Sequence, residues 1–165
     1  MLFRSPFNVD GNATMSLHTP GGISDNFNFQ IQAAAPSIFR SGSAGPETGL
    51  ATITRADNNQ LVTPSNPIHS NDTIVIWATG LGRTSPPIDA GLPAPSDPLA
   101  SAVIVPTVNL GGTALNVTYA GLVPGSVGLY QINATVPGKA PEGMAVPLVV
   151  NQGGSSTTLS VRVVK

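Results

Sequence analysis

Cysteine is absent from this chain of 165 residues, and charged side chains are scarce. Without cysteine there is no disulfide framework, thiol nucleophile or thiolate metal site. Lys and Arg together number 7, and Asp and Glu together number 8. Since the basic residues form no cluster, neither a nucleic-acid footprint nor a patch for anionic membranes is expected. The longest unbroken apolar run, 74–78, is too short to cross a bilayer.

Helical periodicity is nearly missing as well, and strand signals take its place. The 18 Gly and 16 Pro are spread along the chain and separate many short β-branched segments. These segments predict an all-β fold. We expect strands near 12–18, 25–32, 49–55, 60–63, 72–78, 107–110, 113–120, 129–136, 145–151 and 156–164.

Alternation within these segments predicts how the strands pack. In 113–120, the residues expected on one side are Leu115, Val117 and Tyr119. In 129–136, they are Tyr130, Ile132, Ala134 and Val136. Such alternation is typical of antiparallel sheets with one packed and one solvated face. Two of these sheets stacked as an immunoglobulin-like β-sandwich is the simplest architecture.

The connections carry turn chemistry. Tight hairpins are expected at Asp57-Asn58-Asn59, Gly111-Gly112 and Gly153-Gly154. Pro147 has no N–H for a ladder hydrogen bond, so its strand should lie at a sheet edge or be bulged there. The proline-rich segment 79–106 is interpreted as a crossover between the two sheets, although long loops can also be functional.

The beginning of the chain resembles its end. Shifted by 132 positions, TPGGISDNFNFQIQ (19–32) matches NQGGSSTTLSVRVV (151–164) in its Gly-Gly and in its apolar phase. A fixed offset held over 22 positions, 11–32 against 143–164, favours an internal repeat over an accidental match of two hairpins. Residues 11–32 are therefore expected to be the last two strands of a preceding sandwich.

This repeat predicts two parts. Residues 1–36 would hold the leading hairpin of a truncated immunoglobulin-like unit and the joint Ala33-Ala34-Ala35-Pro36. Residues 37–165 would form one complete immunoglobulin-like sandwich. The chain is accordingly interpreted as a fragment of a longer tandem array.

Four stretches also resemble a known family. AAAPSIF (33–39), ATGLG (78–82), GLVPGSVGLYQINATVP (121–137) and the closing VPLVVNQGGSS are similar to the Solibacter-type C-terminal domain, an uncharacterised family. The resemblance covers residues 8–165. It implies immunoglobulin-like tandem modules at the C-termini of large secreted or surface proteins, chiefly of acidobacteria. It implies no activity.

Catalytic signals are weak. His69 lies near Ser70 and Asp72, but neighbouring residues of an extended segment point to opposite faces, so a Ser/His/Asp triad is not expected. Asp89 and Asp97 share the proline-rich segment and are the best calcium candidates, although turn capping explains them better.

Three aromatic residues are candidates for stacking on a sugar: Trp77, Tyr119 and Tyr130. Trp77 follows an apolar run, which favours a core anchor, and both tyrosines lie on the apolar phases of their strands. Carbohydrate binding therefore depends on whether any of these rings is exposed.

The hairpin is the strongest functional candidate. Its apolar residues form a candidate assembly face, and an isolated two-stranded hairpin is marginal in water. This face consists of Met15, Leu17, Phe27, Phe29 and Ile31. We expect a non-enzymatic structural module of a bacterial extracellular or cell-surface protein, acting in spacing, adhesion or head-to-tail assembly by strand complementation.

The expected partners are other copies of the chain or a neighbouring immunoglobulin-like domain, with polysaccharide as a further candidate. No cofactor, nucleic acid or membrane insertion is expected. The alternative is a carbohydrate-binding accessory module of a secreted enzyme.

Overall fold

The computed structural model describes residues 11–41 and 49–165, and in this part of the chain every regular element is a strand. The all-β fold class is therefore confirmed. No described segment is a helix long and apolar enough to span a bilayer. The leading part predicted for residues 1–36 is described only from Gly11 onward.

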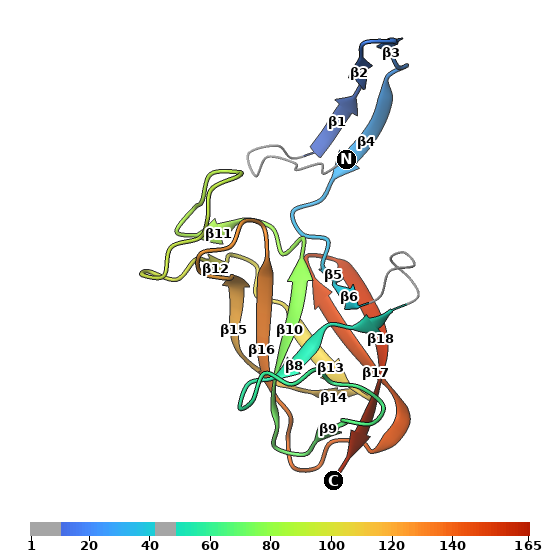
Figure 1. Ribbon diagram of the computed structural model, residues 1–165, viewed down its shortest axis with the longest axis vertical. Helices are drawn as coiled ribbons and strands as arrows, with labels where there is room; N and C mark the ends of the chain where they lie inside the picture. Colours follow the sequence, from blue (N-terminus) through green and yellow to red (C-terminus); the bar gives the residue numbers. More distant parts are fainter. Residues whose placement is uncertain (1–10, 42–48) are drawn as a thin grey trace.

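The leading hairpin forms as predicted. It consists of β1 (Gly11–Met15), β2 (His18–Thr19), β3 (Gly22–Ile23) and β4 (Phe27–Ile31), and these strands pair only among themselves in the described chain. We call residues 11–31 the ribbon. Figure 1 shows that it projects from one end of the molecule, while the C-terminus lies at the other end.

A seven-stranded sheet forms one layer of the remaining fold. Its strand order is β11-β12-β15-β16-β10-β5, and β8 also pairs with β10. The strands are β5 (Ser37–Ile38), β8 (Ile53–Arg55), β10 (Thr73–Thr79), β11 (Thr84–Ser85), β12 (Ser101–Ala102), β15 (Asn116–Leu122) and β16 (Tyr130–Thr135).

A five-stranded sheet forms the second layer, in the order β14-β13-β17-β18-β9. Its strands are β9 (Ile68–His69), β13 (Thr107–Leu110), β14 (Thr113–Ala114), β17 (Gly143–Gln152) and β18 (Ser155–Val164). All its pairs are antiparallel except β9 with β18, which are parallel. A separate short pair joins β6 (Arg40–Ser41) to β7 (Leu50–Ala51).

One apolar core joins the two sheets into a sandwich. The seven-stranded sheet contributes Ile74, Ile76 and Ile132, and the five-stranded sheet contributes Leu148 and Val150, all fully buried. Burial of such side chains is the main favourable term in folding. The segment 79–106 leads from β10 in one sheet to β13 in the other, as a crossover does, but it also contains β11 and β12, which form the far edge of the seven-stranded sheet.

Two of the three predicted hairpin turns rest on glycine. Gly111 and Gly112 both have positive φ, as do Gly153 and Gly154, which suits a two-residue turn between antiparallel strands. At the third turn, the φ of Asn59 is 56° and the chain reverses to an isolated bridge between Thr54 and Leu61. The strand predicted at 60–63 is wrong, because only such isolated bridges form there.

The strand that holds Pro147 is not at a sheet edge, since β17 pairs with both β13 and β18. The Pro147 carbonyl accepts a hydrogen bond from Gly111 N (2.7 Å), in the turn that ends β13. Pro147 therefore lies opposite the turn at the end of β13, so the one bond that its missing N–H cannot return is to the turn and not to a strand residue. A register shift lies just before it, between Gly143 and Val146.

A second irregularity corrects the predicted face of Tyr119. The register of β15 against β16 shifts between Val117 and Tyr119. Val117 lies opposite the buried Ala134, but Tyr119 lies opposite Asn133, on the other face. The extra residue of a bulge reverses the side on which later side chains point. The alternation predicted for 129–136 is correct, because its four apolar residues are buried.

Candidate functional site

The predicted assembly face lies on the ribbon and is open to solvent. Met15 lies opposite Phe27, and the exposed fractions of these side chains are 42% and 62%. The rings of Phe27 and Phe29 stack with centroids 6.2 Å apart. Phe29 and Ile31 are half-buried, and Leu17, just beyond β1, is exposed. The ribbon therefore presents an apolar face that no sheet of the sandwich covers.

The strand pairs of the ribbon have counterparts in the closing hairpin, β17 with β18. The pair Gly11–Ile31 of the ribbon corresponds to Gly143–Val163 of the closing hairpin. In the same way Ala13–Phe29 corresponds to Val146–Val161, and Met15–Phe27 corresponds to Leu148–Leu159. The first strand of the closing hairpin holds one more residue, at its bulge between Gly143 and Val146, and its turn holds one fewer. Its four apolar counterparts on β17 and β18, from Val146 to Val161, are buried in the core. The ribbon thus leaves exposed the face that the closing hairpin buries.

The joint at 33–36 is packed against the sandwich. Ala34 is only 2% exposed, and Ala35 N donates to Gly80 O at 2.9 Å. A Cβ on Gly80 would lie 2.2 Å from Ala35 O, and one on Gly82 would lie 2.2 Å from Ala33 O. Both glycines have positive φ, so their lack of a side chain serves the turn and the close approach.

Residues from the other quoted motifs surround the same joint. The Tyr130 hydroxyl donates to Gly82 O at 2.6 Å, and Gln152 Nε2 donates to Leu81 O at 3.0 Å. Gly153, in the turn of the closing hairpin, lies where an added Cβ would be 3.3 Å from the Ala34 Cβ. The motifs that carry the family resemblance therefore meet around the base of the ribbon. We call this arrangement the joint socket.

Burial in the joint socket perturbs one tyrosine. Tyr130 is 2% exposed, and removal from water raises the pKa of its hydroxyl to about 12. A phenolate is poorly solvated there, so the neutral hydroxyl, which donates to Gly82 O, is strongly favoured. This hydroxyl is a structural donor and not an acid–base group that titrates near neutral pH.

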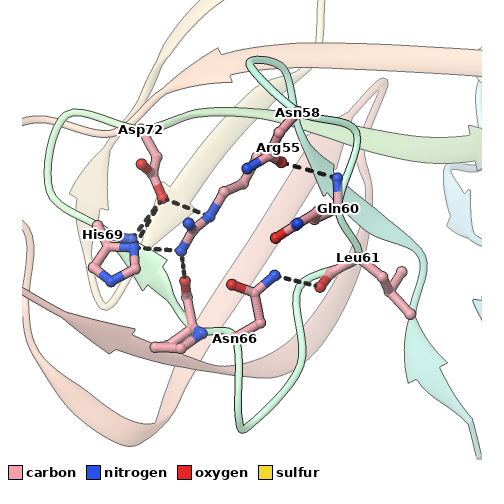
Figure 2. A network of polar contacts seen from close by, with 8 residues as sticks. Arg55, Asn58, Gln60, Leu61, Asn66, His69 and Asp72 are labelled. Carbon is pink, nitrogen blue, oxygen red and sulfur yellow. Dashed lines mark hydrogen bonds and ion pairs between the residues drawn. The ribbon is translucent and has the colours of Figure 1, made fainter.

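The weak triad candidate belongs to a polar cluster at the other end of the sandwich. Figure 2 shows Arg55 reaching from its strand toward Asp72 and His69. Arg55 Nε lies 3.2 Å from Asp72 Oδ2, and His69 N donates to the same oxygen at 2.7 Å. The Arg55 guanidinium also contacts Pro67 O and His69 Nδ1. Asp72 therefore closes the turn after β9 and anchors it to β8.

This cluster does not form the nucleophile–base pair of a hydrolase. His69 Nδ1 faces Arg55 and lies 3.5 Å from Asp72 Oδ2. The backbone N of Ser70 donates to Val164 O at 3.3 Å, and no hydrogen bond joins the Ser70 hydroxyl to His69 among the described residues. The arrangement holds a turn in place, which is a structural use of the three side chains.

Two of the three aromatic candidates are half-buried, and they lie on one face. Trp77 alternates with Ile76 and Ala78, which point into the core, so it lies on the opposite side of β10. The prediction that Trp77 anchors the core is wrong. The β10 side chains that point into the core are those of the adjacent residues, Ile76 and Ala78. Tyr119 lies on the same outer face as Trp77, whereas Tyr130 is buried.

The described residues gather no group of three or more His, Cys, Asp or Glu side chains that could hold a metal. Asp89 and Asp97 therefore have no third such ligand nearby. A hollow on the ribbon itself is lined by residues of β1 and β4: Asn12, Ala13, Thr14, Asn28 and Phe29. Its lining includes no acid or base, so it offers binding surface but no catalytic pair.

No protein-family model, curated protein or solved structure matches the chain. The resemblance to the Solibacter-type domain, like the immunoglobulin-like assignment of the sandwich, therefore stays a prediction.

Sequence reasoning missed several residues that shape these sites. Arg55 was not singled out, although it is the cation that holds the Asp72 turn. Gly80 and Gly82 appeared only as part of a motif, and their contact with the joint spans more than forty positions. The signal available was the pair of glycines directly after a buried strand, a position where the backbone commonly turns.

Proposed function

We propose that this chain is a non-enzymatic structural module of a bacterial extracellular or cell-surface protein. Its ribbon links it to another copy or to a neighbouring immunoglobulin-like domain by strand complementation, in spacing, adhesion or head-to-tail assembly. The observation that carries the proposal is the exposed apolar face of the ribbon, whose counterparts in the closing hairpin are buried.

Backbone edges add to this support. The described part of β1 and β4 pairs with no third strand, so each has a row of unpaired N–H and C=O groups. Such edges favour pairing with another chain, and an apolar face beside them adds burial to the hydrogen bonds. A partner sheet would satisfy both features at once.

The joint socket supports a role in spacing. A flexible linker would leave the ribbon free to adopt many directions, but the joint buries Ala34 and bonds Ala35 N to Gly80 O. The ribbon and the C-terminus lie at opposite ends of the molecule (Figure 1). A module that connects one neighbour at each end of its length needs this arrangement. A fixed joint preserves that direction from one module to the next.

Deletion of residues 1–31 tests this proposal. The cut leaves the joint intact, because Ala34 and Pro36 are buried against the sandwich. The shortened protein should unfold in one cooperative transition and remain monomeric by light scattering, whereas the intact chain should associate as concentration rises. A shortened protein that still associates would show that the ribbon is not the linking element.

A further inference from the structure

The outer face of the seven-stranded sheet, which points away from the core, has an unusual composition. Its central strands β10, β16 and β15 contain no Asp, Glu, Lys or Arg. Beside the aromatic rings of Trp77 and Tyr119, the face presents amides and hydroxyls, such as Gln131, Asn133 and Thr135, all half-buried. The central part of the face is thus polar, uncharged and aromatic at once.

The ring of Tyr119 lies along the sheet. Its hydroxyl donates to Leu122 O at 2.9 Å, three residues further along the strand. A Cβ on Gly121 would lie 2.5 Å from the Tyr119 hydroxyl, so the end of the ring passes directly over this glycine. Because Gly121 has no side chain, the hydroxyl end of the ring packs down on the backbone, and the half-buried ring keeps part of its surface on the outer face.

The indole of Trp77 is held in a similar way. Its Nε1 donates to Thr54 Oγ1 at 3.1 Å, and Thr54 lies opposite Val75 on the neighbouring strand. The indole therefore reaches toward β8 on the same outer side as Val75, which is buried although it points away from the core. This hydrogen bond fixes the ring, so little side-chain entropy remains to be lost when a ligand binds.

Polar groups lie between the two rings. Gln131 lies opposite Trp77 on one side and opposite Gly121 on the other, so its amide is placed between Trp77 and Tyr119. On the same strand, Asn133 Oδ1 is buried and has no hydrogen-bond partner in the part of the chain that the structure describes. The strands β10 and β15 are two spacings apart, about 10 Å, and the indole leans away from β16 toward Thr54 of β8, so a ligand that touches both rings must span at least this distance.

From this placement we propose that the outer face binds an extended, uncharged polysaccharide. Pyranose rings have apolar C–H faces that pack on aromatic rings and equatorial hydroxyls that bond to amides, and this face supplies both kinds of group. The lack of charged residues on its three central strands fits a neutral glycan, and the exposed Arg83 lies only at the β11–β12 edge of the sheet. This site is independent of the ribbon and does not rest on the proposed assembly.

The second sheet provides an internal control. The outward residues of its two long strands include Val149, Thr158 and Ser160, and the face they form has no aromatic side chain. Both faces are rich in hydroxyls and poor in charge. If rings define the site, only the face with Trp77 and Tyr119 binds glycans.

Tryptophan fluorescence provides a direct assay, since Trp77 is the only tryptophan in the chain. The intact protein is titrated with cellohexaose, xylohexaose and chitohexaose, and we expect at least one of them to shift or quench the emission. Tyr119→Ala should weaken that binding at least about tenfold. Tyr119→Phe, which keeps the ring, and Thr158→Ala, on the control face, should bind as the unaltered protein does.

Co-sedimentation with cellulose, xylan and chitin extends the test to Trp77→Ala, whose folding is checked by circular dichroism. If Trp77→Ala does not fold, Tyr119→Ala decides the outcome. Failure of all three oligosaccharides and all three polymers to bind would overturn the proposal. So would binding that Tyr119→Ala leaves unchanged, or binding that Thr158→Ala removes.

Discussion

Met15 lies directly opposite Phe27 in the ribbon, and both side chains are exposed. The equivalent pair in the closing hairpin, Leu148 with Leu159, is buried between two sheets. The same pairing geometry therefore occurs twice in one chain, once covered and once uncovered. A buried side chain of this size contributes about 1.5–3 kcal/mol relative to an exposed one, so the ribbon gains substantially from a partner.

Polar substitutions on the ribbon should affect association but not folding. Phe27→Ser with Phe29→Ser removes the stacked rings and should weaken self-association at least about tenfold. The free energy of unfolding of the sandwich should change by less than about 0.5 kcal/mol, since exposed sites contribute little. Sedimentation velocity and urea unfolding measure the two quantities.

Gln30→Ala is the matched control, because Gln30 lies on the opposite, polar face of the same strand. It should leave association unchanged. Equal loss with either change would mean that the ribbon acts through its fold and not through its apolar face.

The joint socket should not tolerate a side chain at Gly80. Gly80→Ala places a Cβ 2.2 Å from Ala35 O at a φ of +78°, so both the backbone and the joint must shift. We expect a loss of about 2–4 kcal/mol in the free energy of unfolding. Gly125→Ala, with a φ of +74° and no atom within 4 Å of the added Cβ, should lose only about 1 kcal/mol. Similar losses in the two variants would contradict a packed joint.

Asp72 should stabilise the fold through Arg55. The exposed fractions of the Arg55 and Asp72 side chains are 12% and 20%, so the pair is largely shielded from water. Asp72→Ala leaves the Arg55 cation without its carboxylate and His69 N without its acceptor, which should cost about 2–4 kcal/mol by urea unfolding. Adding Arg55→Met should recover part of that loss. A change below about 0.5 kcal/mol would show that the pair is dispensable.

Tyr130 should make the fold sensitive to alkali. Burial raises the pKa of its hydroxyl to about 12, above the ordinary value of 10.0, so the folded state retains this proton more tightly than the unfolded state does. Its contribution to stability is complete below about pH 10 and is lost as pH rises toward about 12. Tyr130→Phe should be less stable by about 1–2 kcal/mol at pH 8, since Gly82 O loses its donor.

The same variant should show a smaller decline in stability between pH 9 and pH 11.5 than the unaltered protein. Urea unfolding at several pH values measures the slope. If the free energy of unfolding declined equally with pH in both proteins, groups other than Tyr130 would cause the sensitivity to alkali.

Much of the fold follows from local pattern. The alternation at 129–136 predicts the buried face of β16, and the Gly-Gly turns define two hairpins. The side of the sheet on which Tyr119 lies could not be predicted from alternation, because one bulge residue in β15 moves the Tyr119 side chain to the opposite side. Trp77 was misplaced because an apolar run does not reveal which alternate residues face the core; only the pairing of β10 decides this.

Short strands and long-range contacts account for the rest. β5 and β9 hold two residues each, too few to show a period, and they form because neighbouring strands pair with them. The β4 side of the ribbon face could be predicted because Phe27, Phe29 and Ile31 repeat as Leu159, Val161 and Val163, whereas the bulge in β17 shifts the match of Met15 by one position, to Leu148. The joint socket could not, since it depends on contacts between four segments distant in the sequence.

Hydrogen exchange at the ribbon tests its need for a partner most directly. Half of the amides of β1 and β4 point outward, away from the partner strand of the ribbon, and exchange freely in a single copy. These amides should be protected from exchange only when another strand pairs with that edge. Exchange measured at a low and a high protein concentration should therefore slow at residues 11–31 as concentration rises, while the sandwich stays constant. Protection at these residues that is the same at both concentrations would contradict linkage between copies through the ribbon.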